Sequence, residues 1–184
     1  CKVPVFSYNK INGIDAYLSP EMKSTGEAIG YDDDLNRAFY KALQAAGTHL
    51  QNYGTVLATI ADHDKEEALP LIRRFYNLGF NIQATEGTGK FLKENGVEAI
   101  EVSWPDEEGD NKIMDMISAH AFDLIVNVPK NHTKRELTNG YKIRRGAIDH
   151  NIPLLTNARL AKAFIESFCA MKLEDIQIKS WQEY

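Results

Sequence analysis

The sequence predicts an α/β fold: a five-stranded parallel sheet flanked by helices in a three-layer sandwich, preceded by an N-terminal extension. From about residue 54, strand-length apolar runs alternate with segments of helical periodicity. Strict alternation of this kind is typical of parallel strands covered by helices on both faces. Residues 56–60 and 124–126 are almost continuously apolar, as in strands buried on both faces. We therefore expect these two strands at the centre of the sheet.

The first 53 residues have a different character. They contain one strand-like run at residues 3–7, a turn-rich stretch, and one helix between a capping Asp34 and a terminating Gly47. The apolar stripe expected on this helix is Leu35, Phe39, Ala42, Leu43 and Ala46. One strand and one helix cannot bury a core alone. We therefore expect residues 1–53 to be the tail of a preceding domain plus a connector helix, with residues 1–30 packing poorly, and residues 54–184 to form the second domain.

The regular part of the chain contains five strands and five helices. The expected strands cover residues 55–60, 81–84, 98–102, 123–128 and 153–156. The expected helices cover residues 64–78, 90–95, 111–119, 141–150 and 157–171. Gly79 and Gly96 follow two of these helices at the position where glycine commonly ends a helix.

Composition argues against several classes of protein. The 184 residues carry a net charge of −5, which does not favour nucleic acid or an anionic membrane as a partner. No apolar run is long enough to span a bilayer. Cys1 and Cys169 give neither metal-ligand spacing nor a disulfide framework, which indicates a reducing compartment. Because the chain lacks an initiating methionine and begins inside an expected strand, we expect it to be a piece of a longer polypeptide.

Residues 85–89 are the most informative stretch, because they read as a tight turn between a strand and a helix. Gly87 and Gly89 allow close backbone approach to a ligand. Thr85 and Thr88 flank a helix N-terminus, where free N–H groups favour an anion. The alternative is a plain helix cap, since threonine and glycine are ordinary capping residues.

Further polar residues follow the other strands, where ligands bind in such sheets. Lys65 lies in the first turn of a helix and either faces an anion or points into water. Trp104 either walls a pocket or packs against the sheet edge. Residues 130–145, which begin with Lys130, carry six lysines and arginines against the single acid Glu136; they form either a solvated face or part of an anion site.

No catalytic or metal-binding arrangement is visible. The sequence has no Ser/His/Asp or Cys/His order, neither the GxGxxG nor the P-loop pattern, and no histidine spacing suited to a metal. The residues alone predict an anion-binding α/β domain with no catalytic residue, metal or cofactor of its own.

Residues 20–27, Pro-Glu-Met-Lys-Ser-Thr-Gly-Glu, resemble the segment that closes the second ATP-grasp unit of the carbamoyl-phosphate synthetase large subunit. Residues 84–88, 123–127 and 141–145 resemble the methylglyoxal-synthase-like domain at the C-terminus of the same polypeptide. The resemblance implies an allosteric domain with the methylglyoxal-synthase-like fold, which regulates ATP-dependent synthesis of carbamoyl phosphate for arginine and pyrimidine pathways.

The resemblance also implies which residues contact the effector. Lys65, Thr85, Thr88 and Asn127 match effector-contacting positions of the family. The UMP-regulated type has a lysine near Trp104, and this chain lacks it; in the N-acetylglutamate-binding type the matching Trp contacts the effector. Asn139 falls near a further contact, and Lys130 replaces an asparagine of that type and suits either a phosphate or a dicarboxylate. We expect a small acidic effector like N-acetylglutamate, with UMP as the runner-up.

Further implications concern partners and place. The resemblance implies ATP and Mg or Mn in catalytic domains outside this chain, the rest of the large subunit, a small glutaminase subunit and an oligomer of the full enzyme. The compartment implied is the cytoplasm, or the mitochondrial matrix in a eukaryote. Two rivals remain open. One is a methylglyoxal synthase-type lyase acting on dihydroxyacetone phosphate, for which Asp110 supplies one carboxylate but Lys130 stands where the other should be. The other is an oligomerisation module that binds no ligand.

Overall fold

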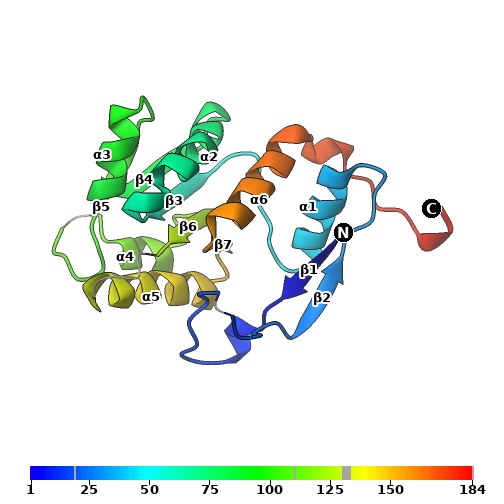
Figure 1. Cartoon of the computed structure of the whole chain (residues 1–184), viewed down its shortest axis with the longest axis horizontal. Coiled ribbons are helices and arrows are strands. Elements are labelled where there is room, and N and C mark those ends of the chain that lie inside the picture. The colour runs from blue at the N-terminus through cyan, green and yellow to red at the C-terminus, as the bar shows by residue number, and fades with distance from the viewer. Residues whose placement is uncertain (19, 110, 130–133, 184) are drawn as a thin grey trace.

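The computed structural model describes residues 1–18, 20–109, 111–129 and 134–183. Its main element is a five-stranded parallel sheet in the order β5-β4-β3-β6-β7 (Figure 1). The strands are β3 (Thr55–Ile60), β4 (Asn81–Thr85), β5 (Ile100–Val102), β6 (Leu124–Val128) and β7 (Leu154–Leu155). The prediction that the first and fourth of these strands are central is confirmed, since β3 lies between β4 and β6, and β6 between β3 and β7.

Helices cover both faces of the sheet, which gives the three layers predicted from the alternating pattern. The helices are α1 (Leu35–Ala45), α2 (Lys65–Asn77), α3 (Glu86–Glu94), α4 (Ile113–Ser118), α5 (Lys134–Asp149) and α6 (Ala158–Ala170). On one face α1, α2, α3 and α6 share the larger apolar core, and on the other α4 and α5 pack over a smaller one. Short 3-10 turns cover Tyr8–Lys10, Asp62–Asp64, Leu173–Asp175 and Trp181–Glu183. No helix in the described ranges is both long and apolar enough to cross a membrane.

Two helices begin earlier than the sequence predicts. Helix α5 starts at Lys134 rather than residue 141, and α3 starts at Glu86 rather than residue 90. The stretch at 85–89 is therefore not a separate turn. Thr85 has extended N-cap geometry, with φ −67° and ψ 154°, so the chain passes from β4 directly into α3. The two glycines lie inside the helix despite costing about 1 kcal/mol each relative to alanine. A Cβ on Gly87 would be in ordinary contact with Lys65 Nζ, 3.6 Å away, so close packing does not explain the glycine there.

The N-terminal segment packs against the rest of the molecule, which corrects the expectation that residues 1–30 pack poorly. Strand β1 (Lys2–Val5) pairs antiparallel with β2 (Gly26–Ile29), a strand that sequence reasoning missed. Val3 and Ala28 are buried in the larger core. Further along, the segment is held by α5, since the Tyr141 hydroxyl donates to the Gly13 carbonyl over 3.1 Å.

Helix α1 is bounded as predicted, and four residues of its predicted stripe, Phe39, Ala42, Leu43 and Ala46, lie in or against the larger core. Asp34 is its N-cap and accepts from the Arg37 amide, and Gly47 follows it with φ +95°. Leu35, expected on the buried stripe, is 74% exposed, whereas Tyr40 is 1% exposed. Tyr40 packs on α6, with its ring centroid 6.0 Å from that of Phe168. The connector helix is therefore part of the same core as α2 and α6.

Candidate functional site

A cavity of about 150 Å³ lies beyond the carboxyl ends of β3, β4 and β6. This is where ligands bind in open α/β sheets. The lining residues come from the strand ends, the first turns of α2 and α3, the loop after β5, and α5; they are Thr59, Ile60, Ala61, Asp62, Lys65, Thr85, Gly87, Thr88, Trp104, Asn127, Val128, Pro129 and Gly140. Five of the seven site residues predicted from sequence therefore line one cavity.

Lys65 brings a positive charge to the cavity wall. Its side chain is only 12% exposed, so it does not simply point into water. The ammonium donates to the Gly87 carbonyl over 2.6 Å and lies 2.8 Å from Oδ1 of Asp62, whose side chain is 67% exposed. It also lies 5.8 Å from the centre of the Phe91 ring. These contacts place the charge beside the N-terminus of α3, where a bound anion would contact both the ammonium group and the free N–H groups of the helix.

The two threonines have different local roles. Thr85 is 3% exposed, and its side chain makes no capping hydrogen bond to α3. Its hydroxyl therefore does not act as the plain helix cap considered above. Thr88 is 2% exposed, and its hydroxyl accepts from the Ile60 amide over 3.2 Å. Thr88 thus ties the first turn of α3 to the end of β3, and Thr85 is the better candidate ligand contact.

The floor of the cavity contains a chain of hydrogen bonds that begins at Thr59. Asn127 Nδ2 donates to Thr59 Oγ1 over 2.6 Å, and Asn127 Oδ1 accepts from Arg144 Nη1 over 2.8 Å. Because a guanidinium only donates, it fixes the orientation of the Asn127 amide. The asparagine oxygen is thereby used internally. The donors that remain for a ligand are one amide hydrogen of Asn127 and the hydroxyl hydrogen of Thr59.

Arg144 is held on its other side by the N-terminal segment. Its Nε and Nη2 each donate to one carboxylate oxygen of Asp15 over 2.6 Å. Partial burial would raise the pKa of Asp15, but the hydrogen bonds and the charge of Arg144 hold that pKa below its usual value. Arg145, the next residue, pairs instead with Asp149 on the same helix. Arg144 and Arg145 are thus each paired with a carboxylate of the chain itself.

The remaining predicted residues lie at or near the rim. Trp104 is half-buried; it lines the cavity and also packs against the smaller core, so both interpretations of this ring apply. Asn139 is buried and donates to Asp106 over 2.6 Å, which ties α5 to the loop after β5; its neighbour Gly140 lines the cavity. Lys130 and Asp110 lie outside the described residues.

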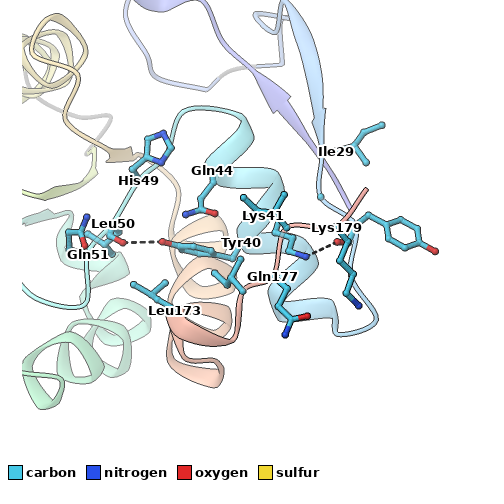
Figure 2. Close-up of a pocket in the computed structure, with 14 residues that line it drawn as sticks. Ile29, Tyr40, Lys41, Gln44, His49, Leu50, Gln51, Leu173, Gln177 and Lys179 are labelled. Atoms are coloured by element: carbon cyan, nitrogen blue, oxygen red, sulfur yellow. Dashed lines mark hydrogen bonds between the residues drawn. The ribbon is translucent and has the colours of Figure 1, made fainter. Parts of the chain in front are cut away.

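A second cavity, of about 620 Å³, lies between α1 and the C-terminal segment. Figure 2 shows its lining, in which the Tyr40 hydroxyl points at Leu50. Lys41 donates to the Tyr31 carbonyl over 3.2 Å. The hydroxyl donates to the Leu50 carbonyl over 3.0 Å, and Lys41 also lies 2.7 Å from an Asp32 carboxylate oxygen. These polar groups serve the protein itself, and the cavity is remote from the strand ends. The smaller cavity is therefore the stronger candidate for a ligand site.

The wall of the smaller cavity offers mainly hydrogen-bond donors. Its described wall offers hydroxyl, amide and ammonium donors, and its one carboxylate there, Asp62, faces Lys65. No cluster of three or more His, Cys, Asp or Glu side chains suited to a metal occurs within the described ranges. The arrangement suits recognition of an anion by hydrogen-bond donors.

Sequence reasoning missed three contributors to this site. Thr59 had a signal, since it is the one polar residue in an otherwise apolar run just before the strand ends. Arg144 was noted only within the basic run and within the resemblance of residues 141–145, with no role at the site. Asp15 had none, because it meets Arg144 across 129 residues of sequence.

The fold and the site define an MGS-like α/β domain. Residues 67–156 match the family model described as the MGS-like domain. The structure is similar to the crystal structure of methylglyoxal synthase from Elizabethkingia anophelis NUHP1, with a TM-score of 0.53 and 22% identity, covering 63% of this chain and 79% of that one. This likeness supports the fold.

Two relatives identify the family more closely. The chain is 40% identical over 182 residues to the carbamoyl phosphate synthase large chain, C-terminal section, of Methanocaldococcus jannaschii, which covers 99% of this chain and 29% of the relative. It is 41% identical over 162 residues to the carbamoyl phosphate synthase large chain of Agathobacter rectalis, which covers 88% of this chain and 15% of the relative. The chain therefore belongs with the C-terminal sections of carbamoyl phosphate synthase large chains, and it spans less than a third of the length of either relative.

Proposed function

We propose that the chain is the effector-binding part of a carbamoyl phosphate synthase and that its effector binds in the cavity at the carboxyl ends of β3, β4 and β6. The observation that carries this proposal is the donor-lined wall. Lys65, Thr85, Asn127 and Thr59 converge there, and the asparagine oxygen is already occupied by Arg144. A ligand that only accepts hydrogen bonds, such as a carboxylate or a phosphate, satisfies such a wall.

Between the two candidate effectors, the structure favours a small dicarboxylate of the N-acetylglutamate kind over UMP. The cavity of about 150 Å³ is smaller than the roughly 300–1,000 Å³ typical of sites for drug-sized ligands. Trp104 offers an apolar face on which an acyl group packs. Among the described lining residues the cation is Lys65, which can pair with one carboxylate of such a ligand.

Isothermal titration calorimetry of the chain with N-acetylglutamate and with UMP tests this proposal. We expect saturable binding of N-acetylglutamate and weaker binding of UMP. The catalytic work belongs to ATP-dependent domains outside this chain, so activity of the full enzyme should respond to the same ligand. Tight UMP binding with no N-acetylglutamate binding would reverse the choice of effector, and binding of neither would refute the proposed site.

A further inference from the structure

Arg144 is a buried cation with contacts on two sides of the molecule. It is 2% exposed and lies in α5. On one side it donates to Asn127, which lines the cavity, and on the other it donates twice to Asp15 in the N-terminal segment. One guanidinium therefore joins the cavity floor to a segment 129 residues away in the sequence.

The contact with Asp15 organises the surrounding residues. Both carboxylate oxygens of Asp15 are engaged by Arg144 in the fork geometry that favours a single orientation. The same carboxylate accepts from the Tyr17 amide over 3.1 Å, and the Tyr17 ring centre lies 5.9 Å from the guanidinium carbon. Residues 13–17 are thus arranged around the arginine.

The contact with Asn127 is equally constrained. A buried guanidinium needs acceptors for its N–H groups, and losing one leaves an unpaired donor. If Asn127 moves toward a ligand or is removed, Arg144 loses its acceptor on the cavity side. The guanidinium then shifts, and the shift carries to Asp15 because the fork is rigid.

We propose that Arg144 couples the cavity floor to residues 13–17, so that a change at Asn127 alters how firmly the N-terminal segment is held. Use of this coupling in regulation rests on the function proposed above. The coupling itself is a property of the ligand-free chain. Binding energies are reciprocal, so a change at Asp15 also alters ligand affinity in the cavity.

Arg145 provides a matched control on the same helix. It donates to the backbone carbonyls of Tyr8 and Ile11 over 3.1 and 3.0 Å and, more weakly, to that of Ile14 over 3.5 Å. It also pairs with Asp149. It therefore holds the N-terminal segment as Arg144 does, but it makes no described contact with a cavity residue. Arg145→Ala loosens the segment without passing through Asn127.

Hydrogen–deuterium exchange of the ligand-free chain tests the coupling. We expect Asn127→Ala to accelerate amide exchange at residues 13–17 by roughly tenfold, the size expected for loss of one charge-assisted hydrogen bond. Unchanged exchange at residues 13–17 in a folded Asn127→Ala protein would overturn the proposal. If circular dichroism shows this variant to be unfolded, Asn127→Thr, whose shorter side chain cannot reach Arg144 but suits a strand, decides in the same way.

Calorimetry with N-acetylglutamate and UMP provides the second arm. We expect Asp15→Asn to weaken binding of the ligand that the wild type binds by at least about fivefold. Arg145→Ala leaves the contacts of Arg144 with Asp15 and Asn127 in place, so we expect it to weaken binding less than Asp15→Asn does. Equal affinities of wild type and Asp15→Asn would also overturn the coupling. If the wild type binds neither ligand, the proposed function fails, and the exchange experiment alone decides on the coupling.

Discussion

Replacing Lys65 with methionine tests whether the cavity recognises an anion. Methionine is similar in length and is a good helix former, so the change removes the charge and its hydrogen bonds while keeping most of the apolar stem. The ammonium donates to the Gly87 carbonyl over 2.6 Å and lies 2.8 Å from Asp62. The first contact joins α2 to α3, the second is to a residue three positions earlier, and the side chain is 12% exposed.

The expected effects on stability and on binding differ in size. A cation in the first turn of a helix opposes the helix dipole, which costs about 0.3–1 kcal/mol, and this offsets the loss of one hydrogen bond worth about 0.5–1.5 kcal/mol. The free energy of unfolding should therefore change by less than about 1 kcal/mol. A charge-assisted hydrogen bond to an anion contributes about 1.5–3 kcal/mol, so affinity should fall roughly 10–100-fold.

Calorimetry and thermal denaturation measure the two quantities on the same protein. Lys90→Met is the matched control, because Lys90 lies on the exposed side of α3 and outside the cavity lining. We expect Lys90→Met to bind the effector as the wild type does. If Lys65→Met binds as tightly as the control, Lys65 does not contact the anion. If affinity and stability fall together, the role of Lys65 is structural. Either result refutes the anion argument.

Three further predictions concern the cavity wall, the N-terminal segment and pH. Thr85→Val removes a hydroxyl that caps no helix, so affinity by calorimetry should fall about tenfold while the melting temperature stays unchanged; a lower melting temperature would contradict this. Gly30→Ala should lower the free energy of unfolding by about 1–3 kcal/mol, because the new Cβ would lie 1.9 Å from the Ala38 carbonyl oxygen. Gly26→Ala is the control, since its Cβ would meet nothing within 4 Å. Equal chemical denaturation midpoints for the two variants would show that the N-terminal segment is not docked. Hydrogen bonds from Arg37, the larger cause, and from Lys41 lower the pKa of Asp32 in the folded protein. Asp32 therefore stabilises the fold at pH values above its unfolded pKa of about 4, and this contribution is lost as the pH falls further. Asp32→Asn should flatten the acid limb of the stability–pH curve, and an unchanged limb would contradict the pairing.

The sheet was predictable because its central strands carry their own signal. The apolar runs at β3 and β6 indicate burial on both faces, and the position of each strand follows from that burial. Strand β2 was not predictable, because Gly-Glu-Ala-Ile has neither an apolar run nor an alternating pattern. It is a strand only because β1 pairs with it, with Val3 opposite Ala28.

The candidate site also has a part that the sequence predicts and a part that it does not. The five predicted residues that line the cavity lie at or just after strand ends; they are Lys65, Thr85, Thr88, Trp104 and Asn127. Because parallel strands end at one edge of a sheet, the convergence of these residues follows from the topology. The start of α3 was misplaced because two glycines outweighed the helical context. The pairing of Arg144 with Asp15 depends on how the N-terminal segment docks against α5, and no local pattern encodes that contact.

The central claim, that the cavity binds a small anionic effector, is tested most directly by the fluorescence of Trp104. Trp104 and Trp181 are the only tryptophans in the sequence, so emission from a Trp181→Phe variant reports on Trp104 alone. Because Trp104 lines the cavity, titration with N-acetylglutamate should shift its emission saturably, and UMP should do so weakly. Emission that does not respond to either ligand at concentrations up to saturation of the full enzyme would contradict the account.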